Sequence, residues 1–202
     1  MRKLPIFPGI ITVLGFAIVA SGLIGLTAYS HRPGLTSESI RNSDDLKKLV
    51  KAHVQGEKTL FLFYHPHCTC TSATISELHD MMGHMASPIP VVAFAFVPES
   101  EEASWIETRA TRSLRRLPRI EIQLDRLGNF AELLGVSTSG CILLIDREGN
   151  EQFRGGITAA RGHIGPCISQ SDLMRACAER ASQRNEWPTF GCQLQSQFSA
   201  KD

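Results

Sequence analysis

The chain has 202 residues, of which 43% are hydrophobic and 20% are charged, and its formal net charge is +1 at pH 7. This near equality of acidic and basic residues excludes the strong positive charge typical of nucleic-acid binding, so we expect no nucleic-acid partner. Six cysteines are many for a chain of this size and direct attention to sulfur chemistry.

Residues 1–30 differ in composition from the rest of the chain. Arg2 and Lys3 precede an uncharged stretch from Leu4 to Ser30, which is long enough for the roughly 20 apolar residues of a membrane-spanning helix. Length favours an N-terminal transmembrane anchor over a cleavable signal peptide, and Ala28-Tyr29-Ser30 is the cleavage site that the second alternative would use. Both alternatives place the bulk of the chain on the extracytoplasmic, periplasmic side, because the positive flank stays inside.

The remaining chain has the length of one domain with a full hydrophobic core. Residues 31–43 are polar and contain a Pro-Gly pair, so we expect a tether there. Residues 44–192 are expected to form the folded domain and residues 193–202 a polar tail. If the domain lies in an oxidising compartment, some of its cysteines are expected to form disulfides.

Apolar periodicity predicts alternating helices and strands along this domain. The predicted elements, in chain order, are a helix over 44–54, a strand over 59–64, a helix ending near 83, a strand over 90–97, a helix over 101–114, a strand over 120–124, a helix over 129–134, a hairpin of strands 141–145 and 151–154, and a helix over 169–184. This order predicts an α/β fold with a mixed central sheet and helices on both faces.

The most informative motif is Cys68-Thr69-Cys70, which lies where the apolar strand ends and the next helix begins. The partial positive charge at a helix N-terminus stabilises a thiolate. A thiolate is the form of cysteine that attacks disulfides or binds metal ions. The motif therefore predicts redox or metal chemistry at this junction.

The stretch from Phe63 to Leu78 resembles the thioredoxin-superfamily signature, in which strand, aromatic residue, Cys-x-x-Cys and helix follow in order. Asp125–Val136 and Ile142–Asn150 resemble the second half of membrane-anchored, periplasmic thioredoxin-like proteins. RedB-like proteins of this group are similar in His65-Pro66-His67-Cys68-Thr69-Cys70, Gly155–His163 and Pro188–Cys192. The resemblance covers about residues 58–192 and implies a thioredoxin-like fold with thiol–disulfide exchange.

Two departures from this signature concern the site. Cys68 falls on the nucleophilic cysteine of the family, but Thr71 falls where the second cysteine belongs, so the chain has Cys-x-Cys. A disulfide between Cys68 and Cys70 would be strained and labile, which suits an oxidant or isomerase. The alternative is that Cys70 is a helix residue and only Cys68 reacts.

The second departure is Gly140, which falls on the family's cis-proline. In the family this proline shapes the substrate groove and keeps metals from the cysteines. The resemblance also implies that Cys141 lies near Cys68, as a third redox residue or a ligand. The alternative is a small buried apolar residue at a strand start.

Histidines near the motif are further candidates. An imidazole within reach would lower the thiol pKa and shuttle protons, and we favour His67, adjacent to Cys68, over His65. Both are alternatively solvated residues at a strand end. In this fold the loop Arg161-Gly162-His163 can approach the site, so His163 is either a site residue or a surface residue.

The other cysteines are Cys167, Cys177 and Cys192. A structural disulfide is expected for two of them, although connectivity does not follow from sequence. Pairing of Cys167 with Cys177 would tie a loop to the last helix. Cys192 would clamp the tail or resolve a mixed disulfide on Cys68.

The leading hypothesis is an extracytoplasmic thiol–disulfide oxidoreductase. Cys68 attacks a protein or small-molecule disulfide, Cys70 resolves the mixed disulfide, Cys141 or Cys192 serves as a further resolver, and His67 lowers the pKa of Cys68. No dinucleotide-binding fingerprint is present, so no cofactor is expected.

The main alternative is a copper(I) carrier that uses Cys68 and Cys70 with a histidine, either His65, His67 or His163. A cluster of soft ligands at residues 79–85 fits this idea, but we favour core packing of Met81 and Met82 as its explanation. A peroxidase of the peroxiredoxin kind would need Thr-x-x-Cys where this chain has Cys68-Thr69-Cys70-Thr71. A scaffold without chemistry is the last alternative.

Overall fold

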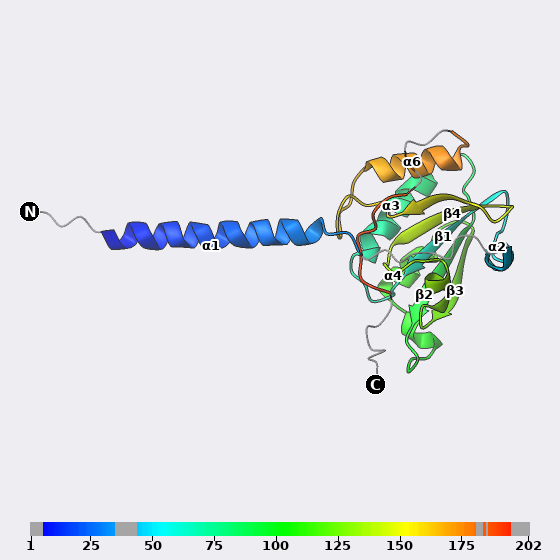
Figure 1. Ribbon diagram of the computed structural model, residues 1–202, viewed down its shortest axis with the longest axis horizontal. Helices are drawn as coiled ribbons and strands as arrows, with labels where there is room; N and C mark the ends of the chain where they lie inside the picture. Colours follow the sequence, from blue (N-terminus) through cyan, green and yellow to red (C-terminus); the bar gives the residue numbers. More distant parts are fainter. Residues whose placement is uncertain (1–5, 35–43, 181–183, 185, 195–202) are drawn as a thin grey trace, which may run out of the picture.

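The computed structural model describes residues 6–34, 44–180, 184 and 186–194, and Figure 1 shows a long helix beside a compact α/β domain. The helix α1 (Ile6–Ser30) contains a 22-residue span from Gly9 to Ser30 with a mean hydropathy of 2.3, none of it buried. This length and composition suit a membrane anchor or a signal sequence. The expected tether and tail lie mostly outside the described residues.

The domain is built on a five-stranded mixed sheet in the order β3-β2-β1-β4-β5, which confirms the predicted architecture. Its central strand β1 runs parallel to β2, β2 runs parallel to β3, and β4 runs antiparallel to both β1 and β5. This is the strand order of a thioredoxin-like fold. The strands are β1 (Lys58–Tyr64), β2 (Val91–Val97), β3 (Ile120–Arg126), β4 (Cys141–Asp146) and β5 (Glu151–Gly155).

Both faces of the sheet are covered because successive side chains of a strand point to opposite faces. Leu60, Leu62 and Tyr64 of β1 pack under α3 (Thr71–Gly83), α4 (Arg109–Leu114) and α6 (Ile168–Cys177). Phe61 and Phe63 pack on the other face, where α2 (Asp44–Lys51) and α5 (Asn129–Leu133) cover the sheet. β1 is apolar along most of its length because its side chains are buried in a core on each face of the sheet.

Two helices differ from the sequence expectation. The predicted helix over 101–114 is a short 3-10 helix η1 (Ala103–Ile106) followed by α4, because Thr108 is extended and its side chain accepts a hydrogen bond from the Thr111 amide. The last helix ends at Cys177 and not near residue 184. Glu179 takes a left-handed conformation there, and the Arg180 amide donates to the Arg175 carbonyl, a common helix ending.

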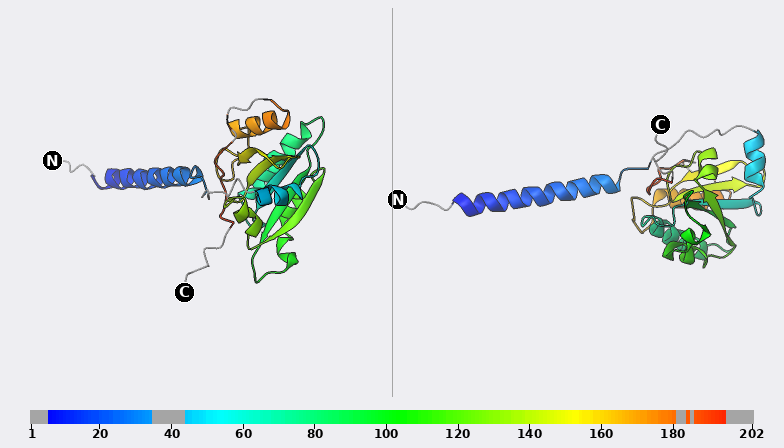
Figure 2. Two further views of the ribbon diagram at one scale, coloured as in Figure 1. Left: turned by 45° about the vertical axis from the view of Figure 1, so that its right-hand side comes forward. Right: turned by 90° about the horizontal axis from the view of Figure 1, so that it is seen from below.

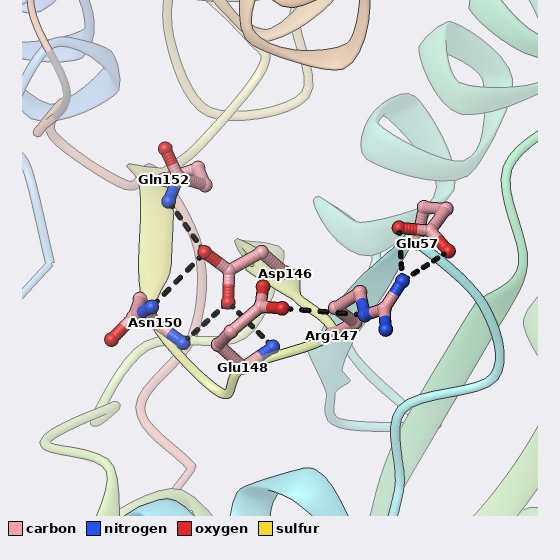
Figure 3. A network of polar contacts seen from close by, with 6 residues as sticks. All are labelled: Glu57, Asp146, Arg147, Glu148, Asn150 and Gln152. Carbon is pink, nitrogen blue, oxygen red and sulfur yellow. Dashed lines mark hydrogen bonds and ion pairs between the residues drawn. The ribbon is translucent and has the colours of Figure 1, made fainter.

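A polar network fixes the turn between β4 and β5 (Figure 3). The Asp146 carboxylate accepts hydrogen bonds from the backbone amides of Glu148 and Asn150 at 3.0 and 2.8 Å, and from the Gln152 side chain at 2.9 Å. Burial opposes ionisation of Asp146, but these hydrogen bonds prevail and lower its pKa. The network holds the register of the hairpin, whose strand β4 begins at Cys141.

The two ends of the domain carry different elements. Figure 1 and the right-hand view of Figure 2 show α1 leaving one end of the domain, while α2 lies toward the opposite end. The segment before the C-terminal trace, residues 186–194, runs along the end from which α1 leaves. This arrangement decides what lies next to the Cys68 junction.

Candidate active site

Cys68 lies in the turn that joins β1 to α3. Its amide donates to the His65 carbonyl at 3.0 Å, and its carbonyl accepts from the Thr71 amide at 3.2 Å. This turn places Cys68 before the first residue of a 13-residue helix and leaves only 4% of the residue exposed. The predicted strand–cysteine–helix junction is therefore present in the structure.

One of the side chains in contact with Cys68 is that of Cys192, whose sulfur lies 2.6 Å from the Cys68 sulfur. The segment that carries Cys192 is anchored to the loop before β4. The Ser139 amide donates to the Cys192 carbonyl at 2.8 Å, and the Leu194 amide donates to the Ser137 carbonyl at 2.8 Å. Two cysteines that are 124 positions apart in the sequence are thus in contact.

The two thiols of this pair differ in acidity. Burial opposes ionisation of Cys68, but hydrogen bonds from Cys192 and Thr71 prevail and lower the pKa of Cys68. The pKa of Cys192 is raised, first by burial and then by its hydrogen bond to Cys68 and the Cys68 charge. Cys68 is thus the more acidic thiol of the pair, and Cys192 the less acidic one.

Cys70 is half-buried at the N-cap position of α3. Burial raises its pKa, and the neighbouring charge of Cys68 raises it further. Three thiols therefore gather here, with Cys68 interacting with both Cys70 and Cys192. The sequence favours Cys70 as the resolving residue, and that role stays a prediction.

Cys141 begins β4 opposite Phe63. It lies in the core on the face of the sheet that α2 and α5 cover. Burial raises its pKa to about 11, while a hydrogen bond to Thr189 and the charge of Arg154 act in the opposite direction. These polar neighbours differ from those of Cys68. Its proposed redox role stays a prediction that these contacts do not support.

The histidines of the motif interact with η1 and the sheet. The His67 Nε2 lies 3.1 Å from the Trp105 carbonyl oxygen, and the two rings are 4.1 Å apart. His65 stacks on Phe96, and burial followed by the charge of His67 lowers its pKa. No hydrogen bond joins either imidazole to Cys68 in the part of the chain that the structure describes. The predicted activation of Cys68 by His67 is thus not supported by a contact.

The position of the family's cis-proline is a glycine turn. No cis peptide bond occurs among the described residues, and Gly140 has φ +91°. A Cβ added at Gly140 would come 2.9 Å from the Thr74 Oγ1. The preceding Ser139 hydroxyl accepts from the His65 amide at 2.9 Å and lies 2.7 Å from the Thr71 hydroxyl. Hydrogen bonds thus connect this loop to the Cys68 turn.

Arg161 is a functional candidate that the sequence analysis passed over for its neighbour His163. The Arg161 guanidinium donates to the Gly191 carbonyl, next to Cys192, and its charge favours ionisation of Cys70 and Cys192. His163 is exposed, with its amide bonded to the Ala160 carbonyl at 3.2 Å. The sequence signal that could have identified Arg161 is a basic residue in a glycine-rich loop that the fold brings close to the predicted thiol site.

A preformed metal site is not found. The described residues contain no group of three or more His, Cys, Asp or Glu side chains arranged to hold a metal ion. Of the histidines of the alternative copper site, His65 stacks on Phe96 and His163 is exposed, and neither belongs to a described group that could hold a metal ion. Met81 and Met82 are buried in the core between the sheet and the helices α3, α4 and α6, which confirms core packing for this pair.

Cys167 and Cys177 cannot form the disulfide considered above. Cys167 caps the start of α6 and Cys177 ends this ten-residue helix. At 1.5 Å per residue the two lie about 15 Å apart along the axis, whereas a disulfide needs Cα atoms within about 7 Å. Cys177 is a largely buried residue whose pKa burial raises to about 12.

The chain resembles known proteins in its fold and not in its sequence. No protein-family model matches the chain, and no curated protein resembles it in sequence. An uncharacterized conserved protein from Geobacillus kaustophilus matches at a TM-score of 0.57 and 15% identity, over 85% of this chain and 92% of that one. A hypothetical protein from Sinorhizobium meliloti matches at 0.57 and 15%, over 84% and 94%. A secreted disulfide oxidoreductase from Mycobacterium tuberculosis matches at 0.45 and 13%, over 68% and 99%.

Proposed function

We propose that this chain is a membrane-anchored, extracytoplasmic thiol–disulfide oxidoreductase of the RedB-like kind, in which Cys68 is the nucleophile and Cys192 the resolving cysteine. The observation that carries the proposal is the 2.6 Å separation of the two sulfurs together with their opposite acidities. This assignment replaces Cys70 by Cys192 in the leading hypothesis. The apolar helix α1 supports the location.

The proposed reaction has two exchange steps. The Cys68 thiolate attacks one sulfur of a substrate disulfide, the substrate S–S bond breaks, and the leaving sulfur takes a proton from solvent. Cys192 then loses its proton to solvent and attacks the Cys68 sulfur of the mixed disulfide. The bond from Cys68 to the substrate breaks, and the second substrate sulfur leaves and takes up a proton. The products are a reduced substrate with two thiols and an oxidised Cys68–Cys192 pair, and the reverse sequence oxidises a substrate dithiol.

Local structure supports each step. The N-terminus of α3 and the hydrogen bonds from Thr71 stabilise the attacking Cys68 thiolate. The charge of Arg161 favours the Cys192 thiolate that must form in the second step. Cys192 is exposed whereas Cys68 is buried, so a substrate reaches the site from the side of Cys192.

The test is a trapping experiment on the full chain in detergent micelles, with a peptide disulfide as substrate. We expect Cys68→Ser to abolish turnover and Cys192→Ser to accumulate a mixed disulfide on Cys68, detected by mass spectrometry. Cys70→Ser is the matched control and should turn over. Accumulation in Cys70→Ser with turnover in Cys192→Ser would instead assign resolution to Cys70.

Copper(I) binding is the competing outcome of the same preparation. The proximity of the Cys68, Cys70 and Cys192 thiols is the observation that favours it, because thiolates are preferred copper(I) ligands. One-to-one retention of copper(I) by the reduced chain, lost on combining Cys68→Ser with Cys70→Ser and without any disulfide turnover, would assign the chain as a metal carrier.

A further inference from the structure

The end of α1 is held against the domain beside the thiol site. The Arg161 amide donates to the Ser30 carbonyl at 2.9 Å, and the Arg161 guanidinium carbon lies 5.1 Å from the centre of the Tyr29 ring. Four residues after α1, the Gly34 amide donates to the Thr189 carbonyl at 2.8 Å. Figure 1 shows the yellow-orange loop before α6 reaching toward this end of α1.

These contacts fix the height of the loop relative to a membrane. The 22-residue span from Gly9 to Ser30 is about 33 Å long, close to the roughly 30 Å of a hydrocarbon core. Tyr29 then lies near the interface, where tyrosine rings are enriched. Since Arg161 contacts Tyr29 and Ser30, the loop that begins at Arg161 lies at the same depth.

The same loop and the first residue of α6 carry the most exposed large apolar side chains of the described domain. Ile164 is 64% exposed and Ile168 is 63% exposed, whereas the next most exposed side chains of this kind, such as Leu127 and Leu133, reach 43%. Leaving such side chains in water forgoes about 25 cal/mol for each Å² of apolar surface that burial would remove from water. Insertion into the interface of a bilayer would bury them.

We propose that residues 161–168 form a membrane contact, in which Ile164 and Ile168 insert into the interface of the bilayer that α1 enters. The contact holds the domain in a fixed orientation and adds to the attachment by α1. Arg32, an exposed residue whose amide donates to the Tyr29 carbonyl at 3.2 Å, adds a cation at this end, where lipid phosphates would pair with it favourably.

This orientation selects the redox partner. Arg161 bonds the Gly191 carbonyl, and Gly34 bonds Thr189, so the segment that carries Cys192 adjoins the membrane contact. If the proposed function holds, the Cys68–Cys192 pair faces a narrow zone at the bilayer surface. Its natural substrate class is then a disulfide or dithiol of a protein that is itself held in the membrane.

The test measures depth in the membrane and uses no thiol chemistry. The full chain is reconstituted in phosphatidylcholine vesicles with or without bromine atoms on the upper part of the acyl chains. Bromine quenches tryptophan emission at short range. The emission added by Ile164→Trp or Ile168→Trp is measured against wild type, which supplies the background of Trp105 and Trp187.

We expect the added emission of both variants to be lost largely in brominated vesicles. Leu49→Trp in α2, at the end of the domain far from α1, is the matched control and should keep its emission. Equal quenching of all three variants, or quenching of none, would overturn the membrane contact. Either result leaves the redox assignment untouched, and an inactive thiol pair would leave the quenching untouched.

Discussion

The side-chain oxygen of Ser139 lies 2.7 Å from the Thr71 hydroxyl oxygen, and both residues are buried. The same Ser139 oxygen accepts the His65 amide at 2.9 Å. One hydroxyl thus joins the loop before β4, the first turn of α3 and the end of β1. Thr71 in turn is hydrogen-bonded to Cys68.

Replacing Ser139 by alanine should therefore destabilise the site. The half-buried His65 amide and the buried Thr71 hydroxyl lose a partner, and we expect the free energy of unfolding to fall by about 1–3 kcal/mol. Urea denaturation followed by tryptophan fluorescence measures this change. Ser76→Ala, on the exposed face of α3, is the control and should stay within about 0.5 kcal/mol of wild type. Equal effects of the two substitutions would contradict this role of Ser139.

Removal of Cys192 should make Cys68 less acidic. The Cys68 thiolate accepts a hydrogen bond from Cys192, so loss of that donor disfavours the thiolate and raises the pKa of Cys68. Alkylation of Cys68 by iodoacetamide, followed against pH by mass spectrometry, should have its midpoint at higher pH in Cys192→Ala than in wild type. At pH values below that midpoint the variant should react more slowly.

Cys192→Ser separates hydrogen bonding from other effects of this substitution. A serine hydroxyl can still donate to Cys68, so its alkylation midpoint should lie between those of wild type and Cys192→Ala. Identical midpoints in all three chains would show that Cys192 does not set the acidity of Cys68.

Gly140 should tolerate no side chain. Its φ of +91° is unfavourable for other residues, and a Cβ would press on the Thr74 Oγ1. We expect Gly140→Ala to lower the free energy of unfolding by about 1–3 kcal/mol. Gly83→Ala is the matched control, because nothing lies within 4 Å of a Cβ there. It should stabilise the chain by about 0.4–1 kcal/mol. A neutral Gly140→Ala would mean that this loop relaxes freely.

The charge of Arg161 should be felt by Cys70. Arg161 favours the Cys70 thiolate, so Arg161→Gln is expected to raise the pKa of Cys70 and slow its alkylation at a fixed pH. Arg161→Lys keeps the charge and should retain most of the wild-type rate. If lysine slows alkylation as much as glutamine does, the effect comes from lost packing and not from charge.

The sheet and the Cys68 junction were predictable because their signals are local. The apolar run that forms β1 and the helical pattern after Cys70 are each read from a few neighbouring residues. The helix over 101–114 was mispredicted because its break depends on the extended conformation of Thr108, which periodicity does not report.

Which cysteine contacts Cys68 could not be predicted from the sequence. Cys70 is two positions away and attracts attention, whereas Cys192 reaches Cys68 only because its segment bonds to the loop before β4. Such contacts are set by tertiary structure and leave no trace in spacing. Arg161 was missed for the same reason, since its interaction with Gly191 joins two loops.

The separation of 124 positions between Cys68 and Cys192 has a consequence for biosynthesis. A chain grows from its N-terminus, so Cys68 and Cys70 are made, and the central sheet can assemble, before Cys192 exists. Until then the nascent polypeptide holds a reactive thiol without its partner. If the proposed function holds, a product truncated after α6 would contain the residues of all five strands and lack the cysteine proposed to close the reaction cycle.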